Sequence, residues 1–131
     1  MSGRLDDDLL DRFIDHTVRV FHVVAQLEND HRRRRVSDQL TGCGSSPGAQ
    51  MFEANEAMSR ADFIKSLGWA AKELSETRYW LKVISKMQWI ADCRLEPLAK
   101  ETQELLNIVK AMKVRSKRRA PIKTSRTAPN A

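Results

Sequence analysis

The 131-residue sequence has little of what builds sheets, disulfide frameworks or membrane spans. It contains two cysteines in no metal-like spacing, five glycines, four prolines and 6% aromatic residues. This composition favours helices over a fold rich in strands and turns. No run approaches the roughly 20 apolar residues of a transmembrane helix, and the acidic start differs from a secretory signal. We therefore expect one cytoplasmic domain whose cysteines, Cys43 and Cys93, are reduced and buried.

The net charge of +6 is concentrated toward the C-terminus. Seven cations and no acids follow Met112, whereas residues 1–112 contain 16 basic and 17 acidic residues. A second basic block lies inside the body and consists of Arg32, Arg33, Arg34 and Arg35. Blocks of this kind either attract phosphates or only keep a protein soluble. For the C-terminal block we favour contact with nucleic acid.

Apolar residues recur at three- and four-residue steps in four segments, which predicts four amphipathic helices. The first covers residues 7–27 and carries one apolar stripe, widened by Val18 and Val23, that is expected to face the core: Leu10, Phe13, Ile14, Thr17, Val20, Phe21, Val24 and Leu27. The second begins at a cap on Asp30. The second is expected to be kinked or interrupted between Gly42 and Gly48, because glycine costs about 1 kcal/mol and proline about 3 kcal/mol in a helix interior. The third begins at Ser59. The fourth begins at Asp92 or a few residues later, at Glu96 before Pro97.

The last two predicted helices repeat their apolar residues every 3.5 positions, the spacing of a left-handed bundle. The repeating positions are Phe63, Leu67, Ala70, Leu74, Thr77, Leu81 and Ile84, followed by Leu98, Thr102, Leu105, Val109 and Met112. We therefore predict an all-α, up-down-up-down antiparallel four-helix bundle over residues 1–116. Residues 117–131 are cationic and contain two prolines, which predicts a disordered basic tail.

The third predicted helix carries two further stripes beside its core positions. The first stripe consists of Trp69, Glu73, Glu76, Trp80, Val83 and Met87. It is either a broad core face or an oligomer interface, where Trp and Met anchors are enriched. The second stripe consists of Lys65, Lys72, Tyr79, Lys82 and Lys86. It is either a solvated face or a nucleic-acid surface, where a tyrosine among cations can stack on a base.

The candidate nucleic-acid-binding set combines this lysine stripe with the arginine block and part of the tail. The tail contributes Lys117, Arg118 and Arg119. Phosphate contacts would dominate such binding, so we expect it to depend on salt and to be largely blind to sequence.

The sequence shows no pattern typical of catalysis. Residues 44–48 match the G-x-S-x-G pattern of a hydrolase, but that motif requires a preceding strand and a histidine later in the chain. All three histidines (His16, His22 and His31) precede it, and each is expected to be exposed or partly packed. The histidines and cysteines do not cluster at metal-ligand spacing. We predict a protein without catalytic activity, metal, cofactor or small-molecule substrate.

Several segments resemble a family of bacterial four-helix-bundle proteins. The resemblance rests on residues 46–49 and 52–57, on Glu96, Pro97 and Leu98, and above all on the run Glu-Thr-Arg-Tyr-Trp-Leu at 76–81. The family was first met as proteins encoded in intervening sequences of 23S ribosomal RNA genes. It includes the accessory variability determinant of diversity-generating retroelements. Pro47 and Gln50 depart from the family pattern, which usually has a β-branched residue and an asparagine there.

The resemblance implies a homopentamer of bundles without catalytic activity. For the retroelement relatives it implies binding to nucleic acid and to a reverse transcriptase through positive surface. Two hypotheses follow for this chain. The first is an oligomeric accessory protein that binds RNA or DNA, and the second is a protein-interaction scaffold that binds no nucleic acid. Neither involves a membrane.

Overall fold

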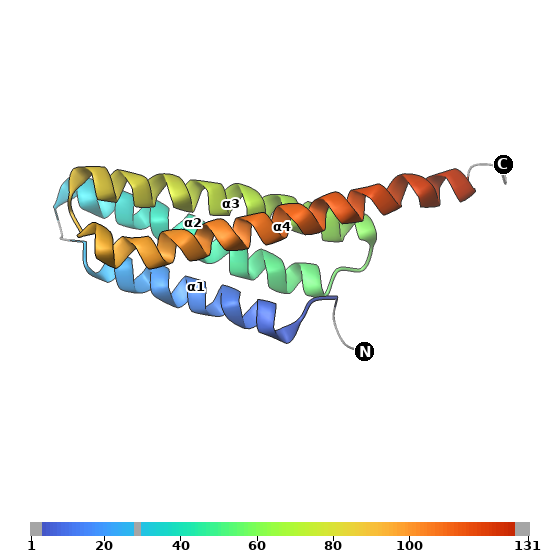
Figure 1. The fold of residues 1–131 in the computed structure, drawn as a ribbon, viewed down its shortest axis with the longest axis horizontal. Helices are drawn as coiled ribbons and strands as arrows, with labels where there is room; N and C mark the ends of the chain where they lie inside the picture. The colour runs from blue at the N-terminus through green and yellow to red at the C-terminus, as the bar shows by residue number, and fades with distance from the viewer. Residues whose placement is uncertain (1–3, 28–29, 128–131) are drawn as a thin grey trace.

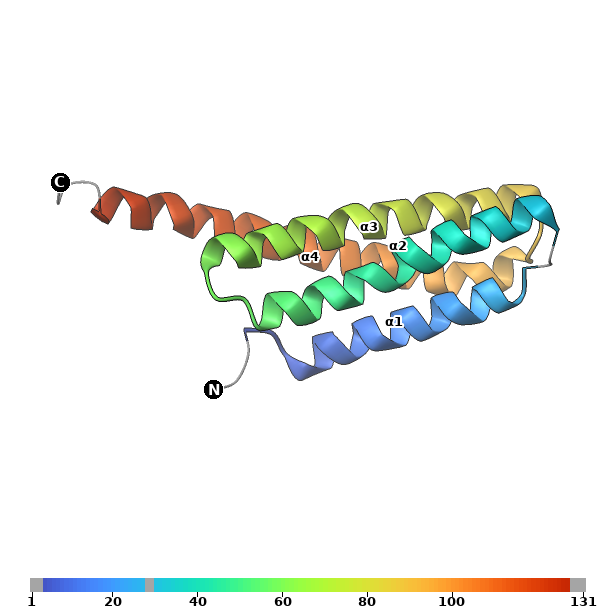
Figure 2. The same ribbon diagram turned by 180° about the vertical axis from the view of Figure 1, so that it is seen from behind.

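The computed structural model describes residues 4–27 and 30–127, with side chains through Arg118, and over these residues it contains four helices and no strand (Figure 1). The helices are α1 (Asp7–Ala25), α2 (His31–Asn55), α3 (Arg60–Met87) and α4 (Asp92–Thr127). Each helix packs against the next in sequence, and α4 also packs against α1. The predicted antiparallel four-helix bundle is therefore confirmed. Figures 1 and 2 both show α4 running past the end of the other helices.

The predicted helix starts agree closely with the structure. The Asp30 side chain accepts a hydrogen bond from the Arg33 backbone N–H at 2.9 Å, and the Ser59 hydroxyl accepts one from the Asp62 N–H at 3.1 Å. Both side chains thereby satisfy a backbone donor that has no partner inside its helix. Helix α4 begins at Asp92, the earlier of the two predicted starts.

The end of α4 differs from the sequence-based expectation. Its helical backbone continues to Thr127, about eleven residues beyond the expected end near Ser116. Lysine and arginine are good helix formers and favour the continuation as far as Arg119, whereas Pro121 lies inside this segment and opposes it. Side chains after Arg118 and all of residues 128–131 lie outside the described part of the chain. The disordered tail at 117–131 therefore stays a prediction.

The apolar core is divided into two clusters along the bundle. One contains Leu10, Phe13, Met51, Phe63, Leu67, Leu74 and Leu105, and the other contains Val20, Leu40, Leu81, Ile84, Leu95 and Leu98, among others. Every predicted core position of α3 is buried, and on α4 all are buried except Met112, which is partly exposed. The heptad pattern thus identified the seam of the bundle correctly.

A buried polar layer separates the two apolar clusters. It contains His16 of α1, Thr77 of α3 and Thr102 of α4, each 0% exposed. His16 Nε2 lies 2.8 Å from Thr102 Oγ1, which donates its own proton to the Leu98 carbonyl at 2.8 Å. The direction of the His16–Thr102 hydrogen bond depends on the tautomer of the imidazole, whose Nδ1 is buried. Burial lowers the pKa of His16 to about 4, against the opposing effect of the Glu101 carboxylate.

Helix α2 passes through this layer as one continuous helix, so the expected interruption between Gly42 and Gly48 was wrong, while the alternative of a kink stays a prediction. Pro47 has no N–H for the Cys43 carbonyl one turn earlier. The Thr77 hydroxyl of α3 reaches that carbonyl at 3.0 Å and replaces the missing donor. Tertiary packing thereby overcomes the low helix propensity of the segment.

The two buried glycines of α2 permit close packing against α1. A Cβ atom on Gly44 would stand 2.5 Å from a methyl group of Val20, and one on Gly48 would stand 3.3 Å from the Thr17 hydroxyl. Both glycines are buried, whereas Gly42 is exposed and has open space around it. The glycine spacing is therefore a packing feature of the α1–α2 contact.

Three further expectations were wrong. His16 was expected to be at least partly exposed but is completely buried, because it occupies the core-facing side of α1 between Phe13 and Val20. Cys93 was expected to be buried but is exposed in the first turn of α4, whereas Cys43 is buried as expected. The apolar stripe predicted for the core of the first helix was too broad, since α1 leaves Ile14, Val18 and Phe21 between 44% and 46% exposed.

Candidate nucleic-acid interface

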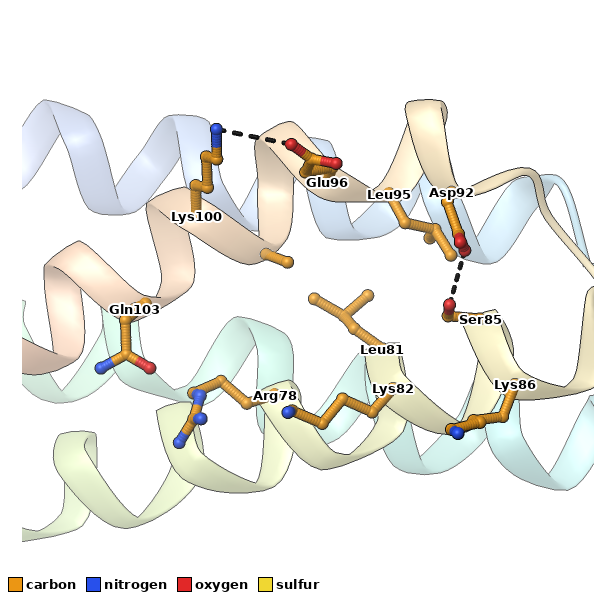
Figure 3. Close-up of a pocket in the computed structure, with 11 residues that line it drawn as sticks. Arg78, Leu81, Lys82, Ser85, Lys86, Asp92, Leu95, Glu96, Lys100 and Gln103 are labelled. Atoms are coloured by element: carbon orange, nitrogen blue, oxygen red, sulfur yellow. Dashed lines mark hydrogen bonds and ion pairs between the residues drawn. The ribbon is translucent and has the colours of Figure 1, made fainter.

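A groove of about 490 Å³ lies between the C-terminal half of α3 and the first half of the bundled part of α4 (Figure 3). Its floor is apolar and consists of Leu81, Leu95 and Ala99. Leu81 and Leu95 are almost completely buried, so the floor is part of the packed bundle. The rims are polar, and the two helices contribute different charges to them.

The α3 rim carries three cations one helical turn apart: Arg78, Lys82 and Lys86, here called the cationic row. Residues four positions apart lie on one face of a helix, about 6 Å from one another along its axis. Figure 3 shows the three side chains following one another along α3. Among the described side chains, none of the three has a carboxylate within ion-pair distance. The row therefore presents unneutralised positive charge along one edge of the groove.

The α4 rim carries Asp92, Glu96 and Lys100. The Lys100 ammonium lies 3.4 Å from a Glu96 carboxylate oxygen, and the Ser85 hydroxyl of α3 donates to Asp92 Oδ1 at 2.5 Å. Figure 3 shows both contacts. The acids thus interact with α4 itself and with the end of α3, and they leave the cationic row without partners. Gln103 adds an amide at the end of the groove near Arg78.

The structure separates the predicted lysine stripe into three environments. Lys82 and Lys86 line the groove between α3 and α4. Lys65 lines a different hollow, between α2 and α3, together with Glu53, Glu56 and Asp62. The Lys72 ammonium lies over the Trp69 ring at 4.8 Å, and Tyr79 is 56% exposed with its ring edge-on to Trp80. Only the end of the stripe nearest the α3–α4 turn belongs to the groove.

The arginine block lies in the first turn of α2, at the same end of the bundle as Lys86 (Figure 2). Arg32, Arg34 and Arg35 are exposed. Arg33 has a structural role, because its Nε lies 3.2 Å from Asp30 Oδ2 and its guanidinium covers the Trp89 ring at 5.1 Å. Backbone hydrogen bonding from Arg33, together with its charge, lowers the pKa of the exposed Asp30 carboxyl.

The tail cations lie at the opposite end of the molecule from the arginine block. Lys117 and Arg118 are exposed on the part of α4 that runs past the bundle (Figure 1). The side chain of Arg119 lies outside the described residues. The predicted basic residues are therefore spread over the groove with the adjoining arginine block, the α4 extension, and the separate surroundings of Lys65 and Lys72.

The Trp69–Met87 stripe is neither wholly buried nor wholly exposed. Trp80 packs against the second core cluster and donates from its indole N–H to Glu76 at 3.3 Å. Trp69 and Met87 are 45% and 49% exposed, while Glu73, Glu76 and Val83 have intermediate exposure. Burial and the neighbouring Glu76 raise the pKa of Glu73. Trp80 therefore fits the broad core face, whereas an interface role for the more exposed members stays a prediction.

Sequence reasoning missed two surfaces that the structure reveals. Arg78 was not among the candidate residues, although its spacing of four from Lys82 was a signal that could have identified it. The exposed stripe of Ile14, Val18 and Phe21 on α1 was assigned to the core, because its three- and four-residue steps resemble a core pattern.

The G-x-S-x-G pattern lies entirely inside α2. A nucleophile elbow requires a sharp turn from a strand into a helix, so the context of that motif is missing here. None of the helices, over the residues that the structure describes, is long and apolar enough to cross a membrane.

The arrangement defines a class: a four-helix bundle with a polar central layer and a one-sided cationic groove. The family model of the 23S rRNA-intervening sequence proteins matches residues 7–111. The chain therefore belongs to this family, as the sequence resemblance indicated.

A solved structure from Bacteroides thetaiotaomicron VPI-5482, described as a protein with unknown function from the S23 ribosomal protein family, is similar to the chain. It is 30% identical with a TM-score of 0.75, and the match covers 80% of this chain and 97% of that one. No functionally curated protein shows significant similarity. The comparisons thus agree on fold and family.

Proposed function

We propose that this protein is a non-enzymatic nucleic-acid-binding member of its family and that the cationic row contributes the main phosphate contacts. The single observation that carries the proposal is that Arg78, Lys82 and Lys86 are adjacent and unneutralised. Like charges four residues apart each destabilise a helix by about 0.2–0.5 kcal/mol. A polyanion that binds along the row removes this repulsion and releases its own counterions.

The neighbouring basic regions support the same proposal. Arg32, Arg34 and Arg35 extend the positive surface around the end of the bundle where Lys86 lies. Lys117 and Arg118 provide a second, separate contact on the α4 extension. Tyr79 is exposed beside the row and offers an aromatic face for stacking.

Fluorescence anisotropy with labelled RNA and DNA oligonucleotides at low salt tests this proposal. We expect both to bind to the full chain, with an affinity that falls steeply as salt increases. A chain that ends at Ser116 retains the groove and separates its contribution from that of the tail. The absence of binding to either nucleic acid at low salt would refute the proposal.

We also propose that the protein self-associates, as the family resemblance implies for a homopentamer. Two partly exposed apolar surfaces support this: Trp69 and Met87 on α3, and the stripe of Ile14, Val18 and Phe21 on α1. Exposed aromatic and methionine anchors are typical of interfaces. Light scattering of the full chain measures the mass directly.

The second candidate function is a protein-interaction scaffold, with a reverse transcriptase as the partner that the retroelement relatives suggest. The α1 stripe favours it, since three apolar side chains at helical spacing suit a helix–helix contact. Pull-down with the tagged full chain and a candidate reverse transcriptase, after nuclease treatment, tests it. Recovery that survives nuclease and is lost in Val18→Glu would support a direct protein contact.

A further inference from the structure

The two rims of the groove differ in sign, and this difference restricts what the groove can hold. The α3 rim contributes three positive charges, from Arg78, Lys82 and Lys86. The α4 rim contributes the two carboxylates of Asp92 and Glu96 against the single ammonium of Lys100. A polyanion is therefore attracted to one edge of the groove and is repelled from the other.

The floor between these rims suits a ligand with a flat apolar face. Leu81, Leu95 and Ala99 form it, and Ala99 leaves space because its side chain is a single methyl group. A volume of about 490 Å³ lies within the range of pockets that hold small ligands. Gln103 and Ser85 lie at the two ends of the groove; the Gln103 amide nitrogen donates to Asn107 at 2.9 Å and the Ser85 hydroxyl donates to Asp92, so their oxygens can accept a hydrogen bond from a ligand.

We infer that the groove binds a single strand of nucleic acid, with successive phosphates along the cationic row and the bases turned across the floor toward α4. This inference rests on the proposed function and specifies its substrate. A base on the floor meets the partly exposed Ala99 methyl group and the small exposed parts of Leu81 and Leu95, and its edges face the carboxylates and the amide of α4. The rotatable backbone of a single strand can match cations about 6 Å apart.

A duplex fits this groove poorly for an electrostatic reason. Its bases are paired inside and its surface carries two rows of phosphates. With one row along Arg78, Lys82 and Lys86, further phosphates of the duplex approach the Asp92 and Glu96 side. There they meet like charge, and the apolar floor receives no base. The negative charge of the α4 rim therefore weakens the binding of a duplex more than the binding of a single strand.

Anisotropy titrations with a single-stranded oligonucleotide and the matching duplex, each as RNA and as DNA, test the inference on the full chain. We expect the single strand to bind at least tenfold more tightly. Lys82→Gln should remove one phosphate contact and lower the slope of log K against log salt by about 0.7 for the single strand. Lys110→Gln makes the same charge change on exposed α4 surface outside the groove and should leave that slope almost unchanged.

Glu96→Gln tests the discriminating rim separately. It should tighten duplex binding several-fold more than single-strand binding, because it removes like charge that only the duplex approaches. Glu53→Gln also removes one negative charge, but on the exposed surface of α2. It should tighten the binding of single strand and duplex equally. Circular dichroism on every variant checks that the bundle is retained.

The outcomes separate the two claims. Equal affinity for single strand and duplex, or an equal effect of Lys82→Gln on both, overturns the single-strand inference and leaves nucleic-acid binding intact. A Lys110→Gln variant that weakens binding as much as Lys82→Gln also overturns it, because the groove then has no special role. If neither nucleic acid binds to the full chain, the proposed function and this inference fail together.

Discussion

Replacing Thr77 by valine should destabilise the bundle through a carbonyl on another helix. Pro47 leaves the Cys43 carbonyl without its usual donor, and the Thr77 hydroxyl lies 3.0 Å from that oxygen. The same hydroxyl lies 2.9 Å from the Glu73 carbonyl of its own helix, so its proton is shared. Valine keeps the shape and the β-branch of threonine but has no proton to donate. The substitution therefore removes the hydroxyl's hydrogen bonds to the Cys43 and Glu73 carbonyls and changes the packing little, and the Glu73 carbonyl keeps its own helix donor.

The expected magnitude follows from burial. Thr77 is 0% exposed and Cys43 is 3% exposed, so water cannot easily replace the lost donor. A buried polar group left without a partner costs about 1–3 kcal/mol. In a Pro47→Ala background, the restored N–H of residue 47 satisfies the Cys43 carbonyl within α2. Thr77→Val should then cost less, by about 1 kcal/mol or more.

Urea unfolding of four proteins measures this coupling: the wild type, the two single variants and the double variant. The cycle cancels the effect of losing the proline ring, since Pro47→Ala occurs on both of its sides. Changes in unfolding free energy that add within about 0.3–0.5 kcal/mol would show that the two residues act independently. That result would refute the explanation for the uninterrupted helix.

Three further predictions concern stability and assembly. Gly44→Ala should destabilise the bundle by about 1–3 kcal/mol, because the new Cβ would stand 2.5 Å from buried Val20. Gly42→Ala has open space and should stabilise the bundle by up to about 1 kcal/mol. Urea unfolding measures both changes. Burial lowers the pKa of His16 to about 4, so below pH 6.5 the unfolded chain binds a proton that the folded chain excludes. The free energy of unfolding should therefore fall by about 2 kcal/mol between pH 7 and pH 5. The fall should be smaller in His16→Gln. Trp69→Glu should reduce the mass in light scattering if the α3 stripe is an interface, and an unchanged mass with native circular dichroism would contradict that role.

The elements with strong periodicity could be predicted from the sequence, whereas the segment where packing overcomes propensity could not. Phe63, Leu74 and Leu105 are buried as the heptads required. In α2 the sequence offered only poor helix formers between Gly42 and Gly48. Their roles depend on Val20 and Thr77, which lie on other helices and are distant in sequence. The residue pattern of one helix does not predict contacts with residues of another helix.

The candidate site was predictable in part for a similar reason. Exposure of Lys82 and Lys86 follows from their position outside the apolar seam, which the heptads identify. That Arg33 is held by Asp30 and Trp89, and that Lys65 lies among acids, depends on neighbouring helices. The groove itself requires α4, whose small Ala99 faces the row. A charge pattern on one helix therefore identifies cations but not which of them remain without partners.

Small residues at helix contacts have opposite consequences on the two sides of this bundle. At Gly44 and Gly48 the side of α1 fills the available space, and the result is tight packing. At Ala99 no helix fills the space, and Figure 3 shows the long cations of the neighbouring positions on α3 running along that helix rather than across the groove. Mutual repulsion among Arg78, Lys82 and Lys86 opposes their folding inward over the floor. The same charges that attract a polyanion thereby keep the groove open for it.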